Sequence, residues 1–224
     1  MLETPKKVRE IYEDIQKKLF YMIPEKWDEL YLYSSVIERF GNVETGELFF
    51  YYIPKGILKK NPINVYEIPN KFNLEEAQYL RLVEILYDKI KELHRIYKKI
   101  EKGNTWSNLT ISIKNMKFTV EYNYEDLQNS EFDSLQRHII WRSKYLGMGF
   151  EKVGKAEREV LNKYSIQLDE ERTEKYEENI YINDIKNLVD YSTEDYETAD
   201  NVEYVATKDT KKRKNQIISF SEDE

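Results

Sequence analysis

The sequence predicts an α+β protein, in which an antiparallel sheet of four or five strands, formed from two hairpins, has helices packed on one face. Segments with apolar residues at every third or fourth position alternate with segments of period two, in the order helix, hairpin, helix, hairpin, helix. The 224 residues carry a formal charge of -7, and the negative charge is concentrated after residue 164. We therefore also expect an acidic C-terminal extension.

The first element is an amphipathic helix. Thr4 is placed to cap it, with Pro5 in the first turn, where the missing N–H costs nothing. Apolar residues then recur on one face as far as Ile23. The helix must end there, because Pro24 disfavours helical geometry in the residue before it.

A hairpin follows this helix. Residues 30–37 and 47–53 alternate in polarity or are rich in aromatic and β-branched side chains, and turn-forming residues 41–46 separate them. Residues 64–68 are predicted to add a short edge strand, closed by Pro69 as edge strands tolerate.

A long helix and a second hairpin come next. Asn73 and Glu76 have the spacing of a reciprocal helix cap, and helical periodicity continues from them to Gly103. Residues 109–113 and 118–124 form the second predicted hairpin. Alternate residues of its second strand share one face of the sheet: Phe118, Val120, Tyr122 and Tyr124. We expect Trp27 and Trp106 to lie in the core.

The last part of the chain divides in two. A helix is predicted from Phe132 to Gly147, whose glycine can adopt the left-handed cap conformation, and a short helix over 154–164. Residues 1–164 have a net charge of +2, whereas residues 165–224 have a net charge of -9 and lose the regular apolar periodicity. We therefore predict a domain over 1–164 and an acidic, partly disordered extension over 165–224.

The composition excludes several classes of site. The chain has no cysteine, which rules out disulfides, thiol nucleophiles and thiolate zinc sites, and it has no Gly-rich phosphate loop. His94 is interpreted as a solvated or half-buried helix residue, and His138 lacks a carboxylate one turn later to orient it as a base. We expect no catalytic residue, cofactor or metal. With no signal-like or membrane-spanning apolar run, a cytoplasmic protein is expected.

Two alternatives remain open from the residues alone. The basic run 211–214 and the aromatic strands would suit a nucleic-acid-binding or regulatory module, although packing within the sheet is the favoured interpretation of the aromatic residues. A hydrolase would need a carboxylate pair such as Glu125 and Asp126, but acidic neighbours are usually solvated surface.

The ordered elements resemble the YezG/EsaG family of bacterial immunity proteins, the antitoxins of LXG-type polymorphic toxins. The resemblance covers roughly residues 8–150 and is carried by the following segments in order: Ile11-Tyr12, Met22-Ile23-Pro24-Glu25-Lys26-Trp27, Leu30-Tyr31-Leu32-Tyr33, Gly46-Glu47-Leu48-Phe49-Phe50-Tyr51-Tyr52, Tyr66-Glu67-Ile68-Pro69, Trp106, Phe118-Thr119-Val120-Glu121-Tyr122-Asn123-Tyr124, Ser130-Glu131-Phe132, Arg137, Trp141 and Lys144-Tyr145-Leu146-Gly147. The lengthened loop from Lys55 to Asn64 and the extension after 165 depart from it.

This resemblance implies a stoichiometric inhibitor rather than an enzyme. Such a protein binds the cognate toxin, often a nuclease domain exported by type VII secretion, in the cytoplasm of the producing cell, without a membrane or a small-molecule substrate. An acidic protein would be steered toward a basic nuclease, so we expect the toxin to contact acidic hairpin ends and a sheet-face tyrosine. The expected contact residues are Glu44, Glu47, Tyr51, Glu121, Glu125 and Asp126. The extension over 165–224 either mimics nucleic acid or is a solvated appendage.

Overall fold

The computed structural model divides the chain into two compact units. One unit comprises Met1–Glu131 with Arg213–Glu224, and the other comprises Phe132–Lys212. The structure describes residues 3–39, 43–56, 61–103, 105–115, 117–193 and 216–220. No helix among these residues is both long enough and apolar enough to span a membrane.

A six-stranded antiparallel sheet forms the centre of the first unit. Its order is β5-β4-β1-β6-β7-β8. The strands are β1 (Trp27–Ser35), β4 (Leu48–Pro54), β5 (Ile63–Asn64), β6 (Asn108–Lys114), β7 (Lys117–Asn123) and β8 (Gln216–Phe220). The α+β class, the antiparallel sheet and both hairpin strand pairs are confirmed. The sixth strand, β8, lies in the segment that we expected to be an extension, and it pairs with β7.

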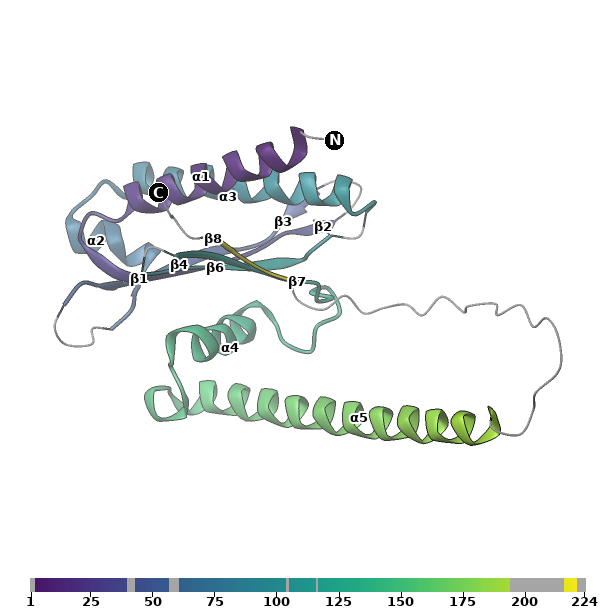
Figure 1. Ribbon diagram of the computed structural model, residues 1–224. Helices are drawn as coiled ribbons and strands as arrows, with labels where there is room; N and C mark the ends of the chain where they lie inside the picture. The colour runs from purple at the N-terminus through teal and green to yellow at the C-terminus, as the bar shows by residue number, and fades with distance from the viewer. Residues whose placement is uncertain are drawn as a thin grey trace. The chain divides into compact units, whose positions relative to one another are not determined.

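Two helices cover one face of this sheet. Figure 1 shows α1 (Glu3–Met22) and α3 (Glu76–Ile100) packed side by side above the strands. Cross-strand partners such as Leu30 and Ile113 point to the same face, and this face holds the core. Its buried sheet residues include Leu30, Leu32, Leu48, Phe50, Tyr52, Leu109, Ile111, Ile113, Phe118, Val120 and Tyr122.

Tyrosine hydroxyls join the helices to the sheet within this core. Tyr12 of α1 shares hydrogen bonds with Tyr122 of β7 and, at 3.2 Å, with Tyr97 of α3. The Tyr97 and Tyr122 rings lie 4.9 Å apart, and the Trp106 ring packs on Tyr122 at 5.4 Å. Trp106 is fully buried, as expected, whereas Trp27 is half-buried against Phe20.

The predicted edge strand over 64–68 is wrong beyond its first residue. β5 ends at Asn64, whose side chain accepts a hydrogen bond from the backbone N–H of Tyr66 at 3.0 Å and starts a turn. The short helices η1 (Val65–Glu67) and α2 (Ile68–Phe72) follow. Pro69 lies in the first turn of α2, where proline is tolerated, so the same residue that suits an edge strand here starts a helix.

The predicted cap of the long helix is also displaced. Asn73 has φ 51°, a left-handed conformation, and ends α2 instead of starting α3. Glu75 caps α3, because its carboxylate accepts hydrogen bonds from the backbone N–H groups of Ala77 (3.1 Å) and Gln78 (2.9 Å). The long helix itself is confirmed and ends at Ile100.

The chain segment that connects β1 to β4 forms a separate two-stranded ribbon. β2 (Ile37–Arg39) and β3 (Val43–Thr45) pair antiparallel, so that Glu38 stands directly opposite Glu44. Like charges in directly opposed positions repel. The ribbon therefore depends on cationic neighbours, which α3 supplies.

The second unit contains α4 (Ser134–Leu146), η2 (Phe150–Lys152) and α5 (Lys155–Thr193). Asp133 and Gln136 form a reciprocal cap at the start of α4, and Gly147 ends it at φ 63°, as predicted. A small core joins Ile139, Val153 and Leu161. The last helix was predicted to end at 164 but continues to Thr193, so the boundary expected near residue 165 falls inside α5.

His138 of α4 is a half-buried imidazole in this unit. Burial, together with the nearby Arg142 guanidinium, lowers its pKa to about 4, although the Glu157 carboxylate opposes the shift. The imidazole is therefore neutral at pH 7 and stays neutral in mild acid.

Acidification from pH 6.5 to pH 4 is expected to destabilise the protein through His138. The unfolded chain binds a proton there near pH 6.5, whereas the folded chain does so only near pH 4, so protons favour unfolding across this window. The free energy of unfolding should fall by about 1–2 kcal/mol more in the wild type than in His138→Gln, after allowance for solvent screening. Urea titrations at both pH values measure the difference, and equal losses would contradict the expectation.

Candidate functional site

The predicted contact residues lie in three different places. Tyr51 of β4 and Glu121 of β7 point to the sheet face opposite α1 and α3, because their neighbours Tyr52 and Tyr122 belong to the core face. Tyr51 lies on a sheet face, as expected, but is only 7% exposed, with its ring edge-on to Phe49 at 6.3 Å. Its role in binding stays a prediction that this burial does not favour, and that of Glu121 is untested.

Glu47 lies between the ribbon and β4. Its backbone joins this segment to the end of β1. The Glu47 carbonyl accepts hydrogen bonds from the Ser35 N–H (2.9 Å) and the Ser34 hydroxyl (3.0 Å), and the Glu47 N–H donates to the Ser35 hydroxyl (3.1 Å). Its side chain is half-buried. The role that the structure gives Glu47 directly is therefore to position the backbone between β3 and β4.

Two of the predicted residues, Glu125 and Asp126, line one surface cavity. This cavity of ≈ 220 Å³, called here the acidic cavity, also has Glu38 of β2 and His94 of α3 in its wall, with Trp106 among its other lining residues. An adjoining cavity is lined by Glu38 and Glu44 together with cationic side chains. Of the predicted residues, Glu125 and Asp126 therefore line the acidic cavity and Glu44 lines the adjoining one. Glu38 lines both cavities.

The loop that carries Glu125 and Asp126 is fixed by side-chain amides. The Asn108 amide donates to the Glu125 carboxylate at 3.3 Å, and the buried Asn123 amide donates to Asn108 at 2.9 Å. The Gln128 amide donates to the backbone carbonyl of Glu38 at 3.0 Å. These bonds connect the loop after β7 both to the sheet and to the ribbon.

Asp126 presents a charge of fixed orientation. Its carboxylate accepts hydrogen bonds from the Asn129 side-chain amide (2.8 Å) and from the backbone N–H groups of Gln128 (3.1 Å) and Asn129 (3.2 Å). The Asn129 amide, followed by its backbone N–H, lowers the pKa of Asp126. Both Asp126 and Glu125 are exposed, and neither forms an ion pair with a residue that the structure describes.

Glu38 and Glu44, by contrast, are each paired with a cation of α3. Lys98 donates to both oxygens of Glu38 at 2.6 and 2.5 Å. Arg95 holds Glu44 with two parallel hydrogen bonds, of which the Nε–Oε1 bond is 3.0 Å. These pairs offset the repulsion between the two opposed glutamates and attach the ribbon to α3.

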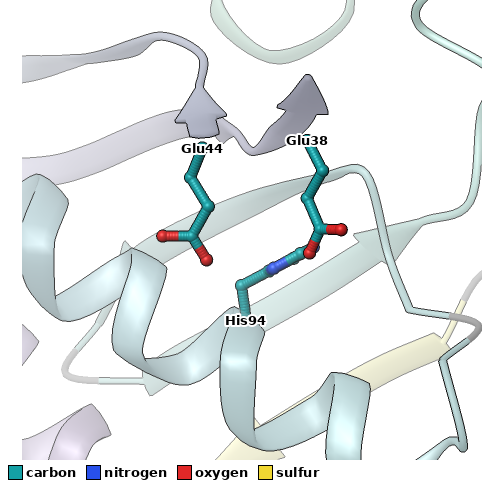
Figure 2. A group of neighbouring side chains, drawn as sticks. All are labelled: Glu38, Glu44 and His94. Carbon is teal, nitrogen blue, oxygen red and sulfur yellow. The ribbon is translucent and has the colours of Figure 1, made fainter. Parts of the chain in front are cut away.

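His94 faces both glutamates and is buried (Figure 2). It was expected to be solvated or half-buried, but its exposed fraction is 2%, because its ring stands edge-on to Trp106 at 4.8 Å. Burial lowers its pKa, and the carboxylates of Glu38 and Glu44 counteract this only in part. Sequence reasoning missed His94 and Glu38 as site residues, since they come together only where the ribbon packs on α3.

The structure also bears on the nucleic-acid alternative. The strand face that carries Phe118, Val120 and Tyr122 is covered by α1 and α3, and none of the three is more than 4% exposed. These residues therefore pack in the core and offer no ring to a nucleic-acid base. The basic run 211–214 lies outside the described residues.

Comparisons with known proteins point in one direction. The family model described as "Immunity protein YezG-like" matches residues 8–162. A protein named Immunity protein YezG from Bacillus spizizenii strain W23 is 32% identical over 148 residues, which are 66% of this chain and 86% of the relative. Another of that name, from Bacillus subtilis strain 168, is 29% identical over 142 residues, or 63% of this chain and 89% of the relative. The type VII secretion system protein EsaG of Staphylococcus aureus strain NCTC 8325 is 28% identical over 144 residues, or 63% of this chain and 83% of the relative.

Proposed function

Because the chain belongs to the YezG-like family of immunity proteins, we propose that it is an antitoxin that binds and neutralises a cognate secreted polymorphic toxin. The observation that carries the proposal is the family match over residues 8–162, which includes both predicted hairpins and the acidic cavity. The likeness to a type VII secretion system protein supports a toxin exported by that route. Neutralisation then takes place in the cytoplasm of the cell that makes both proteins.

The acidic cavity supports the proposal that the toxin presents a basic surface, such as the phosphate-binding surface of a nuclease domain. Glu125 and Asp126 are exposed, lack a cation partner among the described residues and are held by amide hydrogen bonds. Carboxylates in fixed positions resemble the phosphates that such a nuclease binds, and they cost little entropy on association. Electrostatic steering would raise the association rate by roughly 10- to 1000-fold over a neutral pair.

Neutralisation is proposed to occur by occlusion and not by catalysis. The carboxylates Glu38 and Glu44 are engaged by Lys98 and Arg95, and His94 is buried against Trp106. One immunity protein would therefore block one toxin for as long as the complex lasts. The family match ends at residue 162, which supports toxin binding by the matched region, whereas the residues after it continue α5 and add β8 to the sheet.

Co-expression tests the proposed function. Cells that produce a toxin encoded beside this gene should survive when the full chain is made in the same cytoplasm, and should die when an equal amount of an unrelated acidic protein is made instead. Failure to protect against every toxin encoded beside the gene would overturn the proposal.

A further inference from the structure

Three potential metal ligands converge where the ribbon meets α3. A nitrogen of His94 and a carboxylate oxygen of each of Glu38 and Glu44 all lie within 4.8 Å of one another. Figure 2 shows both glutamates extending from adjacent strands toward the imidazole, which comes from the helix. The ligands thus belong to three elements: the neighbouring strands β2 and β3, and α3, which is distant from them in sequence.

The buried nitrogen of His94 is the second, independent observation. Nδ1 has no hydrogen-bond partner although the residue is only 2% exposed. The backbone of Trp106 raises the pKa of the imidazole, against the larger lowering by burial. With the proton on Nε2, the unpaired Nδ1 presents a lone pair to a metal ion. Metal-binding histidines typically have this arrangement, with the second ring nitrogen donating to a carbonyl or carboxylate.

We propose that Nδ1 of His94 and one carboxylate oxygen each of Glu38 and Glu44 bind a divalent transition-metal cation, with Zn²⁺ as the best match. One imidazole and two carboxylates suit Zn²⁺, whose ligands lie at about 2.0–2.2 Å. Ligands at that distance in tetrahedral geometry are about 3.4 Å apart. The ligand atoms now lie up to 4.8 Å apart, and rotation of the two glutamate side chains would shorten these distances. The acidic cavity, lined by Glu38 and His94, leaves room for water in the fourth position.

Lys98 and Arg95 are ion-paired with Glu38 and Glu44, and they compete with a metal for these carboxylates. The Lys98 side chain is 37% exposed and can turn into solvent. Arg95 holds Glu44 from outside, with its side chain 57% exposed, and a carboxylate has lone pairs for both a guanidinium and a metal. Once Lys98 leaves, the +2 ion balances the two carboxylates. The metal would replace an ion pair with a bridge from the ribbon to α3.

Calorimetric titration of ZnCl₂ into the tag-free, chelator-treated full chain tests the site. We expect one equivalent to bind and to raise the melting temperature. Glu38→Gln should weaken binding at least ~10-fold, and His94→Gln should have a similar or larger effect. Lys98→Met should tighten it about fivefold, because it removes the competing ammonium. Glu92→Gln is the control, since it removes a charge of the same helix that pairs with Lys7 and Lys89 instead.

If His94→Gln does not fold, the variants Glu38→Gln and Glu44→Gln still test the site, because both glutamates are less buried than His94. Absence of saturable binding by the wild type would overturn the site. Wild-type affinity in both Glu38→Gln and Glu44→Gln would also overturn it, because the metal would then bind elsewhere. The site is independent of toxin binding, so a chain that neutralises no toxin but passes this titration still contains it.

Discussion

Replacing Gly46 by alanine is expected to lower the free energy of unfolding by about 3–5 kcal/mol. Gly46 has φ +154°, a conformation that side chains rarely adopt. A Cβ atom there would lie 2.0 Å from the Ser35 carbonyl oxygen and 2.6 Å from the Tyr87 hydroxyl, which are themselves hydrogen-bonded at 3.1 Å. Relief of this clash must separate Ser35 from Glu47 and so disrupt the junction between ribbon and sheet.

Two other glycines separate the steric clash from the backbone strain. Gly103 also has positive φ (+96°), but a Cβ atom added there would meet no atom within 4 Å, so Gly103→Ala should cost only about 1 kcal/mol. Gly149 has φ −78° and equally open surroundings, so Gly149→Ala should change stability by less than about 0.5 kcal/mol. Guanidinium denaturation of the three variants measures the series. If Gly46→Ala is no less stable than Gly103→Ala, the proposed packing at Ser35 is incorrect.

The double variant Glu125→Lys/Asp126→Lys is expected to weaken toxin binding about 100-fold, mainly through slower association. This result follows from the proposed function, because both carboxylates would face a basic toxin without a cation of their own. The loss should shrink as ionic strength rises, since salt screens exposed charges. Binding kinetics with the isolated toxin domain at low and high salt measure both effects.

Charge reversal on α5 is the matched control for this variant. Glu159 and Glu170 are exposed residues of the second unit, so Glu159→Lys/Glu170→Lys changes the net charge equally. It should retain most of the affinity. Equal losses in the two double variants would show that net charge alone matters, and no loss in either would place the toxin contact outside the acidic cavity.

Elements with a local signal could be predicted from the sequence. The first helix, both hairpin strand pairs and the Gly147 cap depend on periodicity and on residues within one or two turns, and the structure confirms them. Local signals were misleading where two elements share residue preferences. Pro69 suits both an edge strand and the first turn of a helix, and in the structure it starts α2 beside the buried Ile68.

Non-local contacts could not be predicted. Glu38 becomes a site residue only because its strand turns back and pairs with β3, opposite Glu44. His94 is buried because Trp106, beyond the end of α3, packs against its ring. Nothing in the neighbouring sequence of either residue specifies these partners.

The length of α5 shows a different limit of periodicity. The apolar contacts of this helix with the core of the second unit involve Val160 and Leu161, so the helical pattern of apolar residues fades near residue 165 while the helix continues. Over residues 169–175, which are exposed, ion pairs one turn apart join Asp169 to Arg172 at 3.6 Å and Glu171 to Lys175 at 4.0 Å. A pattern that detects buried faces cannot detect a helical stretch such as residues 169–175, whose side chains are exposed.

The most direct test of the proposed function is a titration of the cognate toxin's activity with the purified full chain. Stoichiometric occlusion predicts that activity falls linearly and reaches zero at one immunity protein per toxin, and that it returns when the complex dissociates. Full toxin activity in the presence of excess immunity protein would contradict the account, and so would lasting inactivation by a small fraction of an equivalent.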